Sequence, residues 1–122
     1  MTMGIRAIRG ATTLERDDSD SMTSAVRELL QEIFSANSLK HEDLISIFFT
    51  STPDLRSTFP ATAARTLDLG DVPLMCAVEV DVPGALPRTV RVMVHTHSER
   101  SLGEIKHIYL GGAVVLRKDL AQ

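Results

Sequence analysis

The feature that most constrains the fold of this 122-residue chain is the excess of strand-like segments over helical ones. Strands are indicated by apolar alternation and β-branched content, and helices by apolar residues spaced three and four apart. The expected helices span residues 19–35 and 58–70, and the expected strands span residues 3–10, 45–52, 72–82, 89–96 and 106–110. Two helices can cover only one face of such a sheet. Its second apolar face therefore needs a partner, most simply other copies of the chain.

The helix predicted at residues 19–35 carries the clearest periodic pattern in the chain. Its apolar side chains recur on one side, and Asp18, Ser19 and Asp20 suit the positive N-terminal end of a helix. In the second predicted helix, Pro60 fits the first turn and Gly70 follows the end. A helical turn is expected at residues 41–44 and a last strand-like piece at residues 113–117. The expected fold class is α+β, with five strands and two main helices.

Length and composition indicate one globular domain that spans residues 1–122. Hydrophobic residues make up 43% of the chain and charged residues 24%, which is ordinary for a protein with its own core. No apolar run approaches the roughly 20 residues that span a bilayer. The N-terminal segment MTMGIRAIRGATT has arginines where a secretory signal needs an apolar core. We therefore expect a cytoplasmic protein that does not enter the membrane.

The charge balance points away from nucleic acid and towards a small anion. A net charge of −3 gives no support for binding a polyanion. The chain has ten arginines against three lysines, and arginine is the residue whose planar fork grips a carboxylate or phosphate. The single cysteine, Cys76, rules out an internal disulfide. His95 and His97 would share a strand face, but a convincing third ligand for a metal is missing.

Arg91 and Glu79 are the charged residues whose positions most need an explanation. Arg91 lies within TVRVMV, between β-branched and apolar neighbours, and Glu79 lies within the alternating run CAVEVDV. A buried guanidinium without a partner costs several kcal/mol, so Arg91 is expected to meet an acidic group or an anionic ligand. A cross-strand ion pair between Glu79 and Arg91 explains both residues without a ligand. The residues alone leave these two explanations open.

The remaining candidates carry weaker signals. Arg9, Arg65 and Arg117 are each more simply explained as exposed cations whose stems cover apolar surface. Cys76 is more simply a small buried hydrophobe, and Tyr109 a core ring with its hydroxyl at the surface. Residue types and spacing thus lead to an oligomeric α+β protein that has arginine-lined strands and binds a carboxylate.

Several stretches, taken in order, resemble the small trimeric class of bacterial chorismate mutase, the mixed α/β class that is unrelated to the all-helical enzymes. The stretches are IRGATT (8–13) with ER (15–16), TSTPDL (50–55), FPATAAR (59–65), VPLMCAVEVDVPG (72–84), RTVRVMV (88–94) and HIYLGGAVVLRKDL (107–120). They cover nearly the whole chain, and the ordered set is more specific than any one stretch. The resemblance implies a five-stranded mixed sheet and a homotrimer that forms a pseudo-α/β barrel, with three active sites at the subunit interfaces.

The same resemblance implies an activity, the conversion of chorismate to prephenate on the route to phenylalanine and tyrosine, without cofactor, metal or covalent intermediate. Arg91 matches the family arginine that holds the ether oxygen of the breaking bond and one substrate carboxylate. Glu79 matches the carboxylate that accepts a hydrogen bond from the ring hydroxyl of the substrate, alongside Cys76. Arg9 and Tyr109 match a pair that grips a carboxylate.

Other residues match the walls of the family pocket. The resemblance implies that a neighbouring subunit lends Phe59, Ala61 and Arg65, and that a C-terminal stretch with Leu116 and Arg117 covers the pocket.

Two positions depart from the family pattern. Thr62 stands where members can carry a lysine near the mouth of the site. Met75, which also matches a substrate-binding position, stands where a small polar residue is familiar. Both departures can weaken the capture of substrate.

Two other functions compete with the mutase. One is a trimeric enamine/imine deaminase of similar fold, and the other is a non-catalytic trimeric sensor that binds an anion in the same pocket. The stretches FPATAAR and CAVEVDV favour the mutase. Strict alternation puts Cys76 and Glu79 on opposite faces of a strand, so the strand must bulge or end between them if both touch a ligand.

Overall fold

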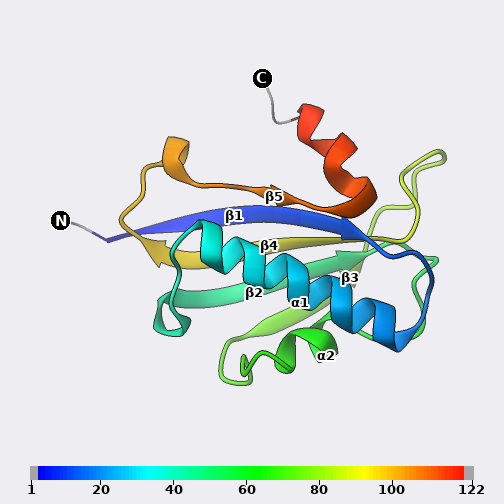
Figure 1. Cartoon of the computed structure of the whole chain (residues 1–122), viewed down its shortest axis with the longest axis horizontal. Helices are drawn as coiled ribbons and strands as arrows, with labels where there is room; N and C mark the ends of the chain where they lie inside the picture. Colours follow the sequence, from blue (N-terminus) through cyan, green and yellow to red (C-terminus); the bar gives the residue numbers. More distant parts are fainter. Residues whose placement is uncertain (1–2, 120–122) are drawn as a thin grey trace.

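The computed structural model describes residues 3–119, with side chains described through Leu116, and it is built around one five-stranded sheet (Figure 1). The strands are β1 (Gly4–Thr13), β2 (Leu44–Ser51), β3 (Leu74–Val78), β4 (Thr89–Ser98) and β5 (Ile108–Tyr109). The helices are α1 (Ser19–Ala36) and α2 (Pro60–Arg65), with 3₁₀ helices η1 (His41–Asp43), η2 (Leu102–Glu104) and η3 (Gly111–Asp119). The predicted α+β class with a five-stranded mixed sheet and two main helices is confirmed.

The sheet has the strand order β3-β2-β4-β1-β5, with β4 at its centre. β4 pairs antiparallel with β1 and with β2, whereas β3 runs parallel to β2 and β5 runs parallel to β1. The β1–β4 pairing covers all ten residues of both strands and places Ala11 opposite Arg91. On the other side of β4, Thr50 of β2 lies opposite Arg91. Residues of three strands thus lie in one row across the sheet.

Helix α1 packs along one face of the sheet through its apolar stripe. The Asp18 carboxylate caps the helix by accepting a hydrogen bond from the Ser21 amide at 2.7 Å. The stripe is fully buried and consists of Met22, Val26, Leu29, Leu30 and Ile33. Gly10 permits this packing, because a Cβ there would lie 2.8 Å from Ile33 Cδ1 and 3.1 Å from the Ile108 carbonyl oxygen. α2 lies on the same face as α1 (Figure 1).

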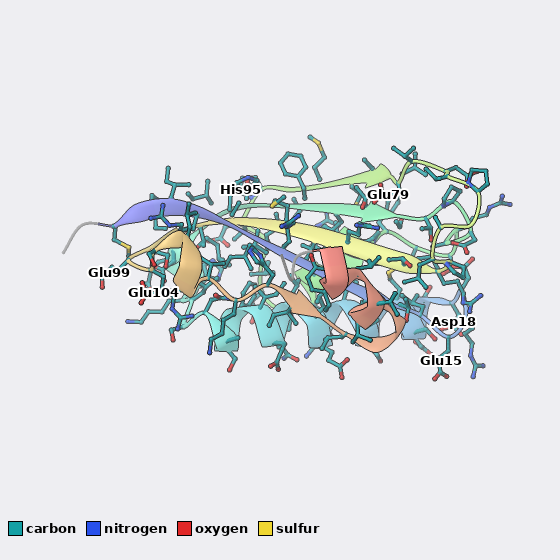
Figure 2. The ribbon with its side chains drawn as sticks, turned by 90° about the horizontal axis from the view of Figure 1, so that it is seen from above. Glu15, Asp18, Glu79, His95, Glu99 and Glu104 are labelled. Atoms are coloured by element: carbon teal, nitrogen blue, oxygen red, sulfur yellow. The ribbon has the colours of Figure 1, made fainter. Side chains whose placement is uncertain are left out.

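The opposite face of the sheet carries no helix within the described residues. Seen from above, the labelled side chains of Glu79 and His95 point away from α1 (Figure 2). Large apolar side chains on this open face remain exposed in the single chain, namely Ile5 (62%), Phe48 (44%) and Met75 (59%). The expected one-sided helix cover and apolar second face are thus both present. No helix of the described chain has the length and hydropathy to cross a membrane.

Several predicted elements differ from the observed ones, since the strand expected to end at Gly10 continues to Thr13 and the strand expected at residues 106–110 is limited to Ile108–Tyr109. The strand-like piece at residues 113–117 is wrong, since these residues belong to the 3₁₀ helix η3. Gly111 has a positive φ of 56° and turns the chain, and the Gly112 amide then donates to Thr13 Oγ1 at 2.8 Å. η3 therefore leaves the edge of the sheet with no strand to pair with. The strand expected at residues 72–82 ends at Val78, and the helix expected at residues 58–70 is limited to Pro60–Arg65.

Asn37, just after α1, fastens the segment that leads into β5. The residue is buried, and its Nδ2 donates to the carbonyl oxygens of Ile33 and Lys106, each at 2.9 Å. Its Oδ1 accepts a hydrogen bond from the Lys106 amide at 2.8 Å. The Asn37 side chain thus replaces a neighbouring strand for this part of the backbone.

Replacing Asn37 with alanine is expected to lower the free energy of unfolding by about 2–3 kcal/mol, because it leaves buried backbone groups unpaired. Chemical denaturation of Asn37→Ala against the unmodified chain measures this difference. Gln31→Ala, an exposed change on the same helix, is the matched control and is expected to stay within about 0.5 kcal/mol. An equal, small effect of both changes would contradict the role assigned to Asn37.

Candidate active site

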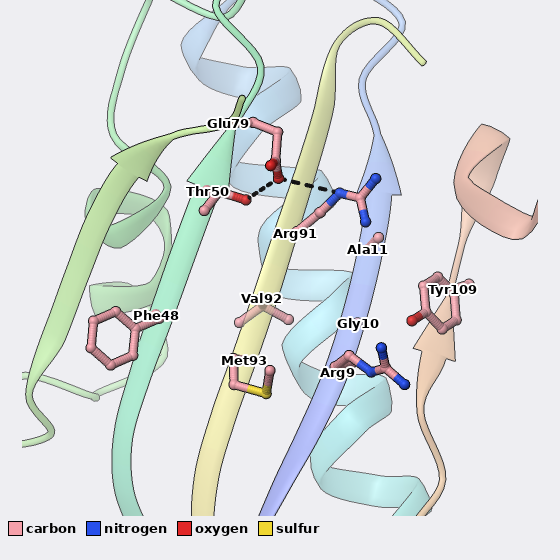
Figure 3. Close-up of a pocket in the computed structure, with 10 residues that line it drawn as sticks. All are labelled: Arg9, Gly10, Ala11, Phe48, Thr50, Glu79, Arg91, Val92, Met93 and Tyr109. Carbon is pink, nitrogen blue, oxygen red and sulfur yellow. Dashed lines mark hydrogen bonds and ion pairs between the residues drawn. The ribbon is translucent and has the colours of Figure 1, made fainter. Parts of the chain in front are cut away.

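A hollow of about 220 Å³ lies on the open face of the sheet, where β1, β2 and β4 run side by side (Figure 3). It is bordered by the segment after β3 on one side and by β5 on the other. Its lining consists of Arg9, Gly10, Ala11, Phe48, Thr50, Glu79, Arg91, Val92, Met93 and Tyr109. The fold thus brings together four residues that the sequence singled out from four separate segments, namely Arg9, Glu79, Arg91 and Tyr109.

Glu79 follows the last residue of β3 and points to the open face, as the alternation that places Met75 there predicts. Its amide still donates to the Ser51 carbonyl at 2.9 Å, so the chain follows β2 for one more residue. The Glu79 Oε2 accepts a hydrogen bond from Thr50 Oγ1 at 2.8 Å and lies 3.3 Å from Arg91 Nε. The Oε1 accepts from the Val80 amide at 3.2 Å. Both carboxylate oxygens are therefore held by the protein, and the side chain has a defined direction.

The predicted contact between Glu79 and Arg91 is confirmed, but the expected route is wrong. β3 and β4 are not neighbours, because β2 lies between them. The carboxylate reaches over Thr50 of β2 to meet the guanidinium, as Figure 3 shows. Glu79 and Cys76 lie on opposite sides of the sheet, as strict alternation predicts, so the bulge or strand end expected if both touched one ligand is not needed for Glu79 to reach Arg91.

Arg91 is half exposed rather than buried, with 49% of its side chain accessible in the single chain. The apolar neighbours that suggested burial, Val90 and Val92, face α1, and Arg91 points to the open face. Its cross-strand partner Ala11 is small, so the guanidinium can lie over β1 (Figure 3). Because Nε faces Glu79, the outer nitrogens of the fork are directed towards the β1 side of the hollow.

Arg9 and Tyr109 line the β5 side of the hollow (Figure 3). β5 pairs with β1 so that Ile108 lies opposite Gly10 and Tyr109 opposite Ala11. The Arg9 amide donates to His107 Nδ1 at 2.9 Å. Burial, and then the nearby charge of Arg9, lower the pKa of His107, which favours the neutral ring that this hydrogen bond requires.

The ends of β2 and β4 next to the Glu79–Arg91 pair are tied by a second set of hydrogen bonds. Thr52 and Thr89 exchange contacts, with the Thr52 amide donating to the Thr89 carbonyl and the Thr89 amide donating to Thr52 Oγ1, both at 3.0 Å. Asp54 accepts from Thr52 Oγ1 and from the Arg88 amide. Burial raises the pKa of Asp54, but these hydrogen bonds outweigh it and lower the pKa below its usual value. The carboxylate thus stays ionised and holds the two strand ends in register.

Among the other residues that the resemblance assigned to the pocket, those with described side chains do not line it in the single chain. Cys76 packs against the core on the helix side of β3, and Met75 lies on the open face beside Phe48 but outside the hollow. Phe59 precedes α2 and is 68% exposed, Ala61 is buried within α2, and Arg65 is exposed at its end. Leu116 is half buried in η3; Arg117 lies in the same helix, and its side chain is outside the described ones.

Thr50 and His107 are functional candidates that the sequence did not single out. The two-residue alternation of FFTST places Thr50 on the same face as Phe48, which is the one signal that could have found it. For His107, no spacing in the sequence relates it to Arg9, 98 positions earlier. In the described part of the chain, no group of three or more His, Cys, Asp or Glu side chains is placed to hold a metal ion.

Two guanidinium groups and one oriented carboxylate, arranged over a floor of small β1 residues, define a site for a small anion that acts through fixed charges. Comparison with known proteins identifies the family to which a chain with this site belongs. Residues 5–120 match the family described as chorismate mutase type I, so the chain belongs to the type I chorismate mutase family.

Two relatives and one solved structure agree with this assignment. The chorismate mutase AroH of Thermus thermophilus is 44% identical over 117 residues, covering 95% of this chain and 96% of that protein. The chorismate mutase AroH of Bacillus subtilis (strain 168) is 42% identical over 120 residues, covering 98% of this chain and 94% of that protein. A solved chorismate mutase from Clostridium thermocellum superimposes with a TM-score of 0.89 at 44% identity, covering 90% of this chain and 98% of that one. The prediction of a chorismate mutase, an isomerase, is confirmed, and the deaminase is not favoured.

Removing the Thr50 hydroxyl is expected to lower kcat/KM for chorismate about threefold to tenfold, the equivalent of one hydrogen bond. Thr50→Val keeps the shape of the side chain but removes the donor to Glu79, whereas Thr50→Ser keeps the donor and serves as the control. Initial rates of chorismate consumption compare the two variants. Equal rates for Thr50→Val and Thr50→Ser would show that the hydroxyl does not orient Glu79.

Proposed function

We propose that the hollow over β1 and β4 is the place where this chorismate mutase rearranges chorismate to prephenate, and that Arg91 and Glu79 carry the chemistry. The observation that carries this proposal is the meeting of Arg9, Glu79, Arg91 and Tyr109 in one hollow. The activity belongs to aromatic amino acid biosynthesis in the shikimate pathway, and no cofactor or metal takes part in the proposed mechanism. We also expect the protein to work in the cytoplasm.

The proposed mechanism uses conformational restriction. A Claisen rearrangement is a single pericyclic step, so it needs no nucleophile and no general acid or base. The substrate is a flexible dianion, and holding its two carboxylates and its ring hydroxyl keeps it in the reactive chair. Arg9 and Tyr109 are positioned to bind one carboxylate at the β5 side of the hollow. Glu79, held by Thr50 and the Val80 amide, is the acceptor for the ring hydroxyl.

Charge stabilisation is the second part of the mechanism. Negative charge grows on the ether oxygen as the C–O bond lengthens, and a fixed cation there stabilises the transition state more than the ground state. Arg91 can supply this cation through its outer nitrogens because Glu79 holds its Nε. Glu79 thus has two roles, since it accepts the substrate hydroxyl and aims the guanidinium.

A homotrimer would complete the site. The open face exposes Ile5, Phe48 and Met75, and the hollow is open towards solvent in the single chain. A neighbouring copy that packs on this face would bury these side chains and could supply Phe59, Ala61 and Arg65 from its own α2 region. Cys76, Met75, Leu116 and Arg117 remain predicted substrate-binding residues.

Arg91→Ala is expected to lower the turnover of chorismate by about 10²–10³-fold, because it removes the cation at the developing charge. Arg91→Lys is expected to be poor as well, because a single ammonium cannot pair with Glu79 and reach the ether oxygen together. Loss of chorismate absorbance measures both rates. Arg16→Ala is the control, since Arg16 is exposed outside the hollow and pairs only with Asp18 at 3.7 Å among the described contacts.

Near-normal turnover by Arg91→Ala would overturn the assignment of this hollow as the active site. An unmodified chain that binds chorismate without converting it would instead favour the non-catalytic sensor.

The trimer is tested by the mass of the protein in solution. We expect about 40 kDa by light scattering, three times the 13.4 kDa of the chain. Phe48→Asp, which places a charge in the centre of the open face, is expected to reduce this mass to that of the single chain. Leu102→Asp is the matched control, because Leu102 is 77% exposed in η2 and lies outside the hollow. A monomeric unmodified protein would contradict the proposal of shared sites.

A further inference from the structure

β5 is the least supported strand of the sheet, although it carries Tyr109 into the hollow. It is two residues long and, among the described strands, pairs with β1 alone. One backbone hydrogen bond continues the pairing, from the Leu110 amide to the Ala11 carbonyl at 2.9 Å. Before the strand, Asn37 holds Lys106 from the helix side. His107 lies between Lys106, which Asn37 holds, and the first residue of β5.

The His107 side chain takes the place of a main-chain acceptor for β1. Arg9 lies opposite Met93 of β4, but its amide is directed away from β4 and donates to His107 Nδ1 at 2.9 Å. A backbone N–H can only donate, so Nδ1 carries no proton and the neutral ring has its proton on Nε2. The contact joins the backbone of Arg9 to the segment that ends in Tyr109, two residues after His107.

We propose that His107 is a positioning residue for substrate binding, because its neutral ring docks β5 on β1 and thereby sets Arg9 and Tyr109 at a fixed separation. This inference rests on the proposed function, in which Arg9 and Tyr109 grip one substrate carboxylate. His107 itself does not line the hollow, so it acts through these two residues.

The close contact between β5 and Gly10 makes this separation sensitive to the docking. A Cβ at Gly10 would lie 3.1 Å from the Ile108 carbonyl oxygen, so β5 packs against β1 at a distance that only a glycine accommodates without a shift. Loss of the His107 contact removes one of the few bonds that hold β5 at this distance, and we expect β5 to shift away from β1. The pair of groups that grips the carboxylate then spreads apart, while the Glu79–Arg91 pair on the far side of the hollow keeps its contacts.

Three variants separate the acceptor from the bulk of the ring. Asn carries an amide oxygen at the position of Nδ1, so His107→Asn keeps the acceptor. Gln places its oxygen one bond further out, and Leu has no acceptor. His41→Leu is the matched control, since it removes a histidine contact of 2.7 Å with Asp71 outside the hollow.

In steady-state assays with chorismate, His107→Leu and His107→Gln are expected to raise KM about threefold to tenfold with a smaller change in kcat. His107→Asn and His41→Leu are expected to stay within about twofold of the unmodified enzyme. A rise in KM with little change in kcat indicates weakened substrate binding rather than lost transition-state stabilisation. If His107→Leu does not fold, His107→Gln provides the same comparison. An unchanged KM in both variants, or an Asn variant as poor as they are, would overturn the proposal.

Amide hydrogen exchange at Arg9, followed by NMR without substrate, tests the contact independently of activity. Exchange is expected to be about tenfold faster in the Leu and Gln variants and unchanged in the Asn variant. Equal protection in all variants would overturn the role of His107 even if KM changes. An unmodified chain that protects Arg9 but does not convert chorismate would contradict the proposed function and not the docking of β5.

Discussion

The ten-residue antiparallel pairing of β1 with β4 is the constraint on which the site depends. α1 buries one face of these strands, so a slip of β4 by one residue would turn Arg91 into the core and expose its valines, and a slip of β1 would do the same to Arg9. The burial of apolar side chains therefore fixes the register. The same register places Ala11 beside Arg91 and leaves room for its guanidinium. The stability of the core and the geometry of the site are consequences of one arrangement.

The short edge strands β3 and β5, which have few backbone hydrogen bonds, flank the central strands and complete the site. β3 stops after five residues, and Glu79 then crosses β2 to reach Arg91, with Thr50 as the intermediate support. β5 contributes Tyr109 through a pairing of two residues, which Asn37 and His107 reinforce by hydrogen bonds from side chains. Short edge elements of this kind need side-chain anchors, because their backbone pairing alone stabilises them little. The residues that hold the edges are therefore as important to the site as those that line it.

Particular elements show how far prediction from the sequence extends. α1 was predicted to within one residue, because eighteen residues of periodic pattern and an Asp18 cap are local signals. The strand expected at residues 113–117 was wrong, because AVVLR has the composition of a strand but Gly111 turns it away from any partner. The contact between Glu79 and Arg91 was predicted from their opposite charges. Its path across β2 was not, because strand order is a long-range property that neither segment encodes.

The sequence by itself determined the fold class, the one-sided helix cover, the excess of arginine over lysine and, through its ordered motifs, the family. Composition, the spacing of apolar residues and the order of motifs along the chain are all properties of the sequence, so none of these conclusions needs contacts between distant residues. Only the tertiary structure decided that Thr50 orients Glu79, that Arg91 lies half exposed over β1, and that His107 meets the Arg9 amide. Each of these contacts joins groups on separate strands, and its geometry depends on a register that the burial of the whole core sets.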